Sequence, residues 1–417
     1  MLSSLRPLRH RNYALIWSAA LTSNIGSWMQ TVAVGVLVTA KTGRAGWTGL
    51  VAAAAFLPIG LLSPLGGLMA DRVDRRKWLF ITTVGETLFA TVLTILAATG
   101  HASPAAVTLL VFGGGAMAAI GFPAYQAMMP SLVPTEELGS AISLSSAQFN
   151  FGRVIGPALA GIAIVAGGYA WAFAINAGSF LAVLVALCFV RLPHIEGPRT
   201  VESVWERLKV GAQATSRTPA ARLAVLLISV VALTASPFIA LIPAVALKAF
   251  HSKASGTSML VTAQGVGAVL GALALTPLAA RFGRHTMLFA NLMAVSMLLV
   301  AYGFSPTLWF AVIVMVAVGA TYIGVLAGCN TMIQLHAPDA LRGRMLGLYM
   351  MALGILYPIG AVVQGTIANV VGIRAVTIAG AVILLAVIGL VFRQRILDAS
   401  TFPGIPATPP DLANAGG

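Results

Sequence analysis

Two ionisable side chains occur alone inside long apolar stretches of the sequence. Glu86 is the only acidic residue, and Arg153 the only basic residue, that lies well inside such a stretch. An ionisable group at membrane depth is costly unless it is paired or hydrated, which makes both residues functional candidates. We predict that Glu86 binds and releases a proton, because burial disfavours the charged carboxylate. Glu86 and Arg153 are the candidates for proton coupling; the alternative is a structural polar contact of Glu86, for example an ion pair with Arg153.

The remaining residues do not form the clusters that enzymes need. All six histidines fall in polar connections or at the ends of apolar stretches, so His, Asp, Glu and Cys do not gather at membrane depth. The sequence contains no GxxxxGK(S/T) phosphate loop, and Cys188 and Cys329 have no ligand-like spacing. We therefore expect that the protein is neither an enzyme nor an ATP-driven pump, and that it has no catalytic residues, metal or cofactor.

The composition indicates a membrane protein. Of the 417 residues, 59% are hydrophobic and 9% are charged, whereas a soluble globular chain has about 25% charged residues. The formal net charge is +14, but the lysines and arginines occur in short runs between apolar stretches. A nucleic-acid binder would instead gather them on one folded face. We expect contact with membrane lipid and none with nucleic acid.

The apolar stretches define the elements that must position these residues. A helix needs about 20 mostly apolar residues to cross a membrane. Twelve stretches meet this requirement, in two blocks of six: 13–40, 47–70, 78–99, 105–128, 141–166, 170–190, 222–247, 256–280, 286–304, 307–328, 345–369 and 373–392. Nineteen of the 25 lysines and arginines lie on one side of these spans and five on the other. Because basic loops are retained in the cytoplasm, we predict a multi-pass protein of the cell membrane with both termini cytoplasmic.

The two blocks of six spans resemble each other in sequence. Residues 70–76 align with residues 279–285, and Gly156 aligns with Gly360. The sequence thus predicts an all-α membrane protein of two pseudo-symmetric six-helix bundles, an architecture of alternating-access carriers. The central loop contains either an amphipathic helix on the inner leaflet or a solvated linker. The expected domains are the N-terminal bundle 1–190, the cytoplasmic central loop 191–221, the C-terminal bundle 222–395 and a disordered cytoplasmic tail 396–417.

The loop between the second and third spans carries a recognisable pattern of glycine, aspartate and arginine. It resembles the signature loop of the major facilitator superfamily in Gly67, Asp71, Arg72, Arg75 and Arg76, whereas Asp74 stands where many members have glycine. Asp71 can accept hydrogen bonds from the N-terminus of a facing helix, where negative charge is favoured. We predict that the six residues form a conformational latch on the cytoplasmic side; a basic topology anchor is the simpler alternative. The second copy has Ala280 in place of Asp71, so its latch is expected to be weaker or absent.

The fifth span resembles the glycine–proline motif of exporters in this superfamily. Small residues give a smooth face for tight helix packing and proline fixes a bend; the motif residues are Gly152, Gly156, Pro157 and Gly161. With the runs at 121–126 and 341–344, the motif resembles the bacterial enterobactin-exporter and macrolide-efflux branch. The resemblance covers essentially all twelve spans and implies export of drugs or siderophores. Many drug-exporting relatives carry an arginine linked to proton transfer in the fourth span, whereas residues 101–140 here contain no Arg or Lys.

Uncharged polar and aromatic residues of the inner spans are the candidates for a substrate cavity. They are Asn24, Gln30, Tyr125, Gln126, Tyr322, Asn330, Tyr357 and Gln364. A cavity with few charges suits a bulky, mostly apolar ligand, and Arg153 would favour negative or carbonyl groups on it. We predict a monomeric secondary transporter that exports bulky amphipathic small molecules by alternating access in exchange for protons. The alternative is a carrier for metabolite uptake or uniport without proton coupling.

Overall fold

The computed structural model describes residues 2–190, 204–252 and 254–397. Every regular element within these ranges is a helix, which confirms the predicted all-helical fold class. The predicted tail from residue 398 onward and the central loop before residue 204 lie outside the described residues.

The N-terminal half contains five long helices and three short 3-10 segments. They are η1 (Leu2–Arg9), α1 (Arg11–Thr42), α2 (Ala45–Arg72), α3 (Arg75–Ala98), α4 (Pro104–Met128), η2 (Met129–Leu132), η3 (Thr135–Glu137) and α5 (Leu138–Phe189). The helix α5 contains two predicted spans, 141–166 and 170–190, joined at a kink. Gly168 has a φ of 73° there, a left-handed conformation that glycine adopts without steric cost. The predicted boundary between the fifth and sixth spans is therefore a kink within α5.

The C-terminal half contains eight helices within the described ranges. They are α6 (Val204–Arg217), α7 (Pro219–Thr234), α8 (Pro237–Phe250), α9 (Ala254–Phe282), α10 (Arg284–Gly303), α11 (Leu308–His336), α12 (Arg342–Val371) and α13 (Ile373–Leu397). The sequence predicts one continuous span over 222–247, whereas α7 ends at Thr234 and α8 begins at Pro237. Proline has no backbone N–H and cannot continue the hydrogen-bond ladder of α7, which explains the interruption.

Ten helical segments in the described ranges are long and apolar enough to cross a membrane, against twelve predicted spans. The difference has two sources. The segment that contains α5 counts once although it holds two predicted spans, and α1 is not among the ten. The helix α1 has 32 residues, but serine, threonine, asparagine and glutamine in its middle lower its hydropathy.

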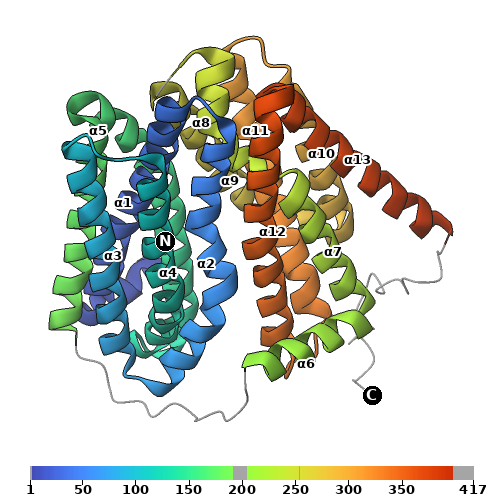
Figure 1. The fold of residues 1–417 in the computed structure, drawn as a ribbon. Helices are drawn as coiled ribbons and strands as arrows, with labels where there is room; N and C mark the ends of the chain where they lie inside the picture. The colour runs from blue at the N-terminus through green and yellow to red at the C-terminus, as the bar shows by residue number, and fades with distance from the viewer. Residues whose placement is uncertain (1, 191–203, 253, 398–417) are drawn as a thin grey trace, which may run out of the picture.

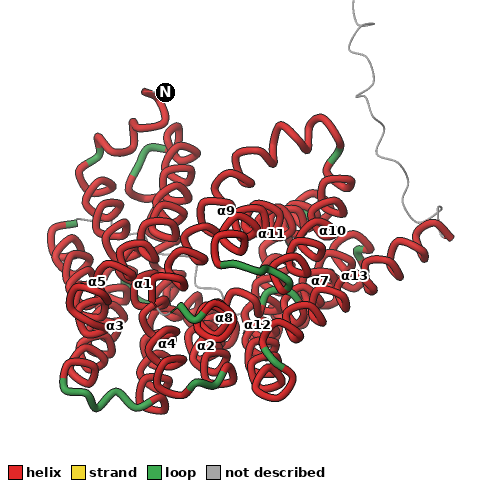
Figure 2. The backbone as a smooth tube through the Cα atoms, turned by 90° about the horizontal axis from the view of Figure 1, so that it is seen from above, coloured by secondary structure: helices red, strands yellow, loops and turns green. Residues whose placement is uncertain are grey.

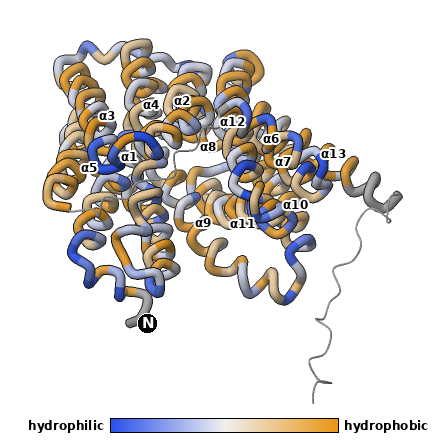
Figure 3. Tube along the Cα trace, turned by 90° about the horizontal axis from the view of Figure 1, so that it is seen from below, coloured by the Kyte–Doolittle hydropathy of each residue, from blue (hydrophilic) through white to orange (hydrophobic). Residues whose placement is uncertain are grey.

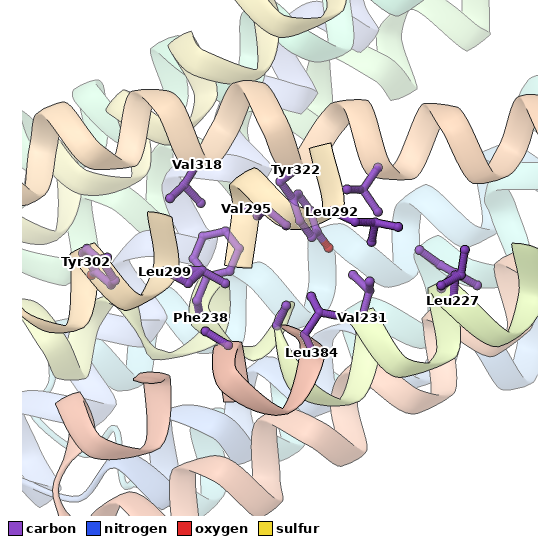
Figure 4. Close-up of a cluster of buried hydrophobic side chains, with 14 of the residues drawn as sticks. Leu227, Val231, Phe238, Leu292, Val295, Leu299, Tyr302, Val318, Tyr322 and Leu384 are labelled. Carbon is purple, nitrogen blue, oxygen red and sulfur yellow. The ribbon is translucent and has the colours of Figure 1, made fainter. Parts of the chain in front are cut away.

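The helices form two groups that meet along α2 and α12. Figures 1 and 2 show α1–α5 gathered on one side and α6–α13 on the other, with α2 and α12 side by side between them. Each group contains most of its own apolar core, although Ala45 of α2 joins the C-terminal core and Ala254 of α9 joins an N-terminal one. In the C-terminal group, Leu227, Phe238, Leu292, Val318 and Leu384 converge from five different helices (Figure 4).

The outward surface of both bundles is apolar. Large side chains such as Leu109, Val165 and Val370 are 70%, 79% and 87% exposed, and hydrophobic residues line the outer turns of the helices in Figure 3. In water such a surface would drive aggregation, whereas lipid chains solvate it. The surface therefore fits a membrane-embedded protein.

Candidate functional site

A cavity of about 260 Å³ lies between helices of both bundles. Its wall comes from α1, α2, α3, α4 and the second part of α5, and α8, α9 and α12 complete it from the C-terminal half. Most of the lining side chains are apolar, and five of them are aromatic: Trp28, Phe56, Phe89, Phe180 and Tyr357. A concave, mostly apolar site with a few polar groups is the usual form of a small-molecule site.

Glu86 is the only charged side chain among the described residues that line this cavity. It lies on α3, whose N-terminus is capped by the Asp74 carboxylate; this accepts the backbone N–H of Lys77 at 2.9 Å. Glu86 follows Arg75, the first residue of α3, by eleven residues, so it lies about 16 Å from the N-terminus of this helix along its axis. Within the described part of the chain, no hydrogen bond or ion pair joins Glu86 to another residue. Its carboxyl group is therefore available to a proton or to a ligand.

Two of the eight predicted cavity residues line the cavity. Gln30 is joined to Asn176, whose side-chain Nδ2 donates to the Gln30 Oε1 at 2.8 Å. Tyr357 packs edge-on against Phe56, with ring centroids 5.3 Å apart. Sequence reasoning missed Asn176, although it is an asparagine inside an apolar span, the signal used for the other polar candidates. These groups supply uncharged polar contacts beside the apolar wall.

Two of the remaining candidates make hydrogen bonds at the break between α7 and α8. The Gln364 Nε2 donates to the backbone carbonyls of Leu233 and Thr234, at 2.9 and 2.8 Å. The hydroxyls of Tyr322 and Ser236 are 2.8 Å apart. Carbonyls freed by a helix break must find donors inside the protein, because lipid offers none. Gln364 and Tyr322 therefore act on the fold around Pro237 rather than on the cavity wall.

Three further candidates also lie outside the cavity wall. Tyr125 stacks on Phe122 with ring centroids 6.2 Å apart. Gln126 is exposed. Asn330 accepts a hydrogen bond from Gln334 one turn further along α11. Tyr125 therefore takes part in helix packing, Gln126 is exposed, and Asn330 makes a hydrogen bond within its own helix.

Arg153 does not pair with Glu86. Its Nη2 donates to the Gln264 Oε1 of α9 at 2.9 Å, and its guanidinium carbon lies 5.8 Å from the centre of the Trp28 ring. No acidic residue pairs with it in the ranges that the structure describes, so the predicted alternative of a Glu86–Arg153 ion pair is not present. The Arg153 Nε and the Gln264 Nε2 are buried without a partner among the described residues. Arg153 thus links α5 to α9 behind Trp28.

The glycine–proline motif lies where α5 contacts two other helices. Gly152 packs beside the Asn24 side chain, and a Cβ at Gly156 would lie 2.7 Å from a backbone carbonyl of α1. Gly161 lies against α9, and Pro157 is buried. Small residues at these positions permit close approach of the helix backbones. Asn24, the last cavity candidate, therefore belongs to the α1–α5 contact.

The basic residues of the signature loop hold the N-terminal bundle together. The Arg75 Nη1 donates to the Ala127 carbonyl at the end of α4, at 3.0 Å. The Arg76 side chain donates to the Leu187 and Cys188 carbonyls at the end of α5, at 2.6 and 2.9 Å. These carbonyls lack partners within their own helices, and cations near a helix C-terminus are favourable.

The two acidic residues of the predicted latch differ: Asp74 caps α3, whereas Asp71 has no partner in the described part of the chain. Asp71 and Arg72 make no hydrogen bond or ion pair with any residue that the structure describes. A Cβ at Gly67, one turn earlier, would meet no atom within 4 Å. Asp71 and Arg72 therefore make no polar contact with a helix of the C-terminal group in the part of the chain that the structure describes.

The opposite end of α2 is held tightly against α12. The Asn369 Oδ1 accepts the backbone N–H of Ala45 at 2.8 Å, across the two bundles. A Cβ at Gly49 would overlap the Ala361 carbonyl. Near the middle of both helices, a Cβ at Gly60 would be 2.8 Å from the backbone of α12. Sequence reasoning missed Asn369, which looks like an ordinary polar residue near the end of a span.

Comparison with known proteins agrees with the fold and with the membrane location. The family model described as transmembrane secretion effector matches residues 2–412. The multidrug efflux pump Tap of Mycolicibacterium fortuitum is 26% identical over 403 residues, covering 93% of this chain and 98% of Tap. The enterobactin exporter EntS of Citrobacter koseri is 26% identical over 348 residues, covering 82% of this chain and 81% of EntS.

Solved structures share the architecture at low sequence identity. A crystal structure of a bacterial homolog of the human lysosomal transporter Spinster, inward-facing and occupied, has a TM-score of 0.75 at 15% identity and covers 95% of this chain and 98% of that one. The nucleoside transporter NupG has a TM-score of 0.69 at 15% identity, covering 92% and 99%. These likenesses confirm the major facilitator fold.

Proposed function

The chain belongs to the transmembrane secretion effector family of major facilitator transporters, and we propose that it exports small amphipathic molecules in exchange for protons. The observation that carries this proposal is the carboxyl group of Glu86, which is the one charged group among the described residues that line a cavity between both bundles. Export is supported by the relatives, a multidrug efflux pump and an enterobactin exporter.

Glu86 is the proposed proton carrier. A carboxylate in an apolar wall is disfavoured by burial, so the group takes up a proton whenever water and ligand are absent from it. The cavity residues around it are uncharged: Gln30 on α1 and Asn176 on α5 are amides, α2 and α4 contribute no ionisable side chain, and Tyr357 on α12 is a phenol. Its protonation state therefore depends on what occupies the cavity.

Alternating access is supported by the uneven contact between the bundles. At one end, Ala45 and Asn369 are joined, and Gly161 packs against α9. At the other end, Asp71 has no partner in the described part of the chain. This arrangement corresponds to a state that is closed at the Ala45 end. In the opposite state, Asp71 would bind the N-terminus of a facing helix and the Asn369 contact would be broken.

The orientation follows from the charged loops. The run from Arg72 to Lys77 and the basic residues of α6 lie at the end of the molecule that carries Asp71, and basic loops face the cytoplasm. We therefore place this end and both termini in the cytoplasm of the cell. The domain division at residues 190 and 222 is part of the same proposal, with α6 between the two bundles as the amphipathic element of the central loop.

Flux measurements in proteoliposomes test the proposal. The full chain is reconstituted, a pH gradient is imposed, and transport of a fluorescent amphipathic compound is followed together with internal pH. We expect substrate movement coupled to counter-movement of protons. Glu86→Gln should abolish the proton movement, because a glutamine cannot carry a proton, while Glu136→Gln at an exposed position of η3, before α5, should leave it intact.

Two results would contradict the proposal. Substrate flux that is unaffected by the pH gradient in the wild-type chain would favour the alternative of uniport. Unchanged proton movement in the Glu86→Gln variant would remove the proposed role of this residue. Because the monomer is the transporting unit in this proposal, chemical cross-linking of the active reconstituted protein should give a single-chain species.

A further inference from the structure

We infer that a small monovalent anion of the halide class, such as chloride, binds between α5 and α9 at Arg153 and Gln264. This site is separate from the cavity that holds Glu86, and the inference does not depend on the proposed exchange of substrate for protons. The anion is a bridge between the two bundles and not the transported molecule.

Two buried donors flank one hydrogen bond at the contact between α5 and α9. The Arg153 Nη2 donates to the Gln264 Oε1 at 2.9 Å. Arginine has only donors, so the amide oxygen faces it and the amide nitrogen of Gln264 is left as a further donor. This Nε2 and the Arg153 Nε are buried without a partner among the described residues, and Gln264 is only 2% exposed. Buried donors need an acceptor, and an anion accepts from both.

The surrounding helices supply no counter-charge for Arg153. The helices α1, α5, α8, α9, α10 and α11 contain no aspartate or glutamate. The one acidic residue of α3 is Glu86, which does not pair with Arg153, and Glu137 lies at the start of α5 and hydrogen-bonds with His10 at 3.0 Å. The face of the Trp28 ring, 5.8 Å from the guanidinium carbon, compensates the charge only weakly. Because charges inside a protein are normally paired, a bound anion is the fitting partner.

The close approach of the two helices limits the size of the anion. Gly265 follows Gln264 on α9, and a Cβ there would lie 3.1 Å from the Arg153 carbonyl and 3.3 Å from the Val154 side chain. Small residues bring helix backbones together in this way. An organic carboxylate or a phosphate ester would have to separate α5 from α9, whereas a single-atom ion fits between two N–H donors. One guanidinium also carries one positive charge, which a monovalent anion neutralises.

The anion would connect the two bundles. Arg153 belongs to α5 of the N-terminal group and Gln264 to α9 of the C-terminal group. An ion that accepts from the Arg153 Nε and the Gln264 Nε2 therefore adds a second link beside the existing hydrogen bond. The two donors come together only in the folded chain, so the anion binds the folded state and stabilises it by mass action. Chloride should thus raise the unfolding temperature, and the effect should saturate.

Replacement of chloride by a bulky monovalent anion tests the inference. The unfolding temperature of the purified full-length protein in detergent is measured while sodium chloride replaces sodium gluconate at constant ionic strength. We expect a saturable rise of about 2–4 °C in chloride. Equilibrium binding of radioactive chloride should saturate at about one ion per chain over the same concentration range, because one pair of donors forms the site.

Three variants separate the anion site from general effects of salt. Gln264→Glu places a carboxylate beside Arg153; in gluconate it should unfold at a temperature at least as high as the wild-type chain in chloride, and it should no longer respond to chloride. Arg153→Gln removes the charge and should lose chloride binding. Ser258→Ala is the control, because the Ser258 Oγ is also buried without a partner among the described residues and faces Gly161 across the same helix contact. This variant should keep the wild-type response to chloride.

Two results would overturn the inference. The first is an equal unfolding temperature of the wild-type chain in both salts, without bound chloride. The second is a chloride response that persists in both Gln264→Glu and Arg153→Gln, since this would be an effect of salt on the whole protein. The inference and the proposed function can also fail separately: proton-coupled flux without chloride binding rejects only the anion site, and chloride binding without proton-coupled flux rejects only the exchange mechanism.

Discussion

The side-chain oxygen of Asn369 accepts the backbone N–H of Ala45 at 2.8 Å, so a residue of α12 caps the first turn of α2. The N-cap position of α2 itself is Arg44, whose side chain makes no capping bond. The first N–H groups of a helix have no partner inside the helix. The cap that α2 lacks in its own bundle is therefore supplied by the other bundle.

Removal of this cap should favour opening at the Ala45 end. Loss of an N-cap acceptor costs about 1 kcal/mol, so Asn369→Ala should raise the population of the state open at this end about fivefold. Opening is measured as the alkylation rate of Ala240→Cys, a cavity position, from outside the vesicles in a chain without its native cysteines. Asn369→Asp keeps the acceptor oxygen and should react at the unmodified rate; equal rates in both variants would argue against the cap.

Close backbone contact between α2 and α12 makes Gly60 sensitive to size. A Cβ there would lie 2.8 Å from the backbone of α12, and overpacking of a tight contact typically costs about 1–3 kcal/mol. Gly60→Leu should lower the unfolding temperature in detergent and slow transport. Gly67→Leu, on the same helix but beside open space, serves as the control and should change the unfolding temperature little.

Substitutions of Asp71 and of Arg76 should have different effects, although both residues belong to the signature loop: the first should slow transport and the second should lower stability. Asp71 has no partner among the described residues, so Asp71→Asn should leave the unfolding temperature unchanged but slow transport, because in the proposed mechanism the end that carries Asp71 would close less often. Arg76→Ala removes two hydrogen bonds at the end of α5 and should destabilise the protein by about 1–3 kcal/mol. An Asp71→Asn variant with wild-type flux would contradict the latch.

Arg153 should behave as a structural link between the bundles. Arg153→Ala removes the bond to Gln264 and leaves its amide oxygen buried, which should cost about 2 kcal/mol of stability. Because Arg153 does not line the cavity, the KM for a neutral substrate should change less than the unfolding temperature. A large rise in KM with unchanged stability would instead place Arg153 at the substrate.

The helical fold could be predicted from the sequence, because an apolar segment in lipid must pair its backbone N–H and C=O groups within the segment itself. The break at Gly167 and Gly168 was visible as two small residues between two spans. The break before Pro237 was not: in membrane helices proline often occurs within a continuous span. Only the structure shows that α7 ends at Thr234 and that Gln364 covers its free carbonyls.

The cavity residues were harder to identify, because these helices are apolar on every side. Periodicity normally reveals which face of a helix is buried, but here lipid and protein interior select the same residue types. Glu86 could be identified as a candidate since it is the only acid within a span. For the uncharged polar residues of the spans no such signal exists: Gln30 lines the cavity, whereas Gln126 is exposed on α4.

One helix, α2, carries both the tight contact and part of the cavity wall. Phe56 and Ile59 face the cavity, and Gly60, the residue after Ile59, touches α12. Mutations that reshape the ligand space from this helix will therefore also disturb the close contact between α2 and α12. During evolution, or in engineering, substitutions in α2 that alter substrate selectivity should also alter the turnover rate. Substitutions at cavity positions of α3 and α4 should be able to change selectivity without changing the turnover rate.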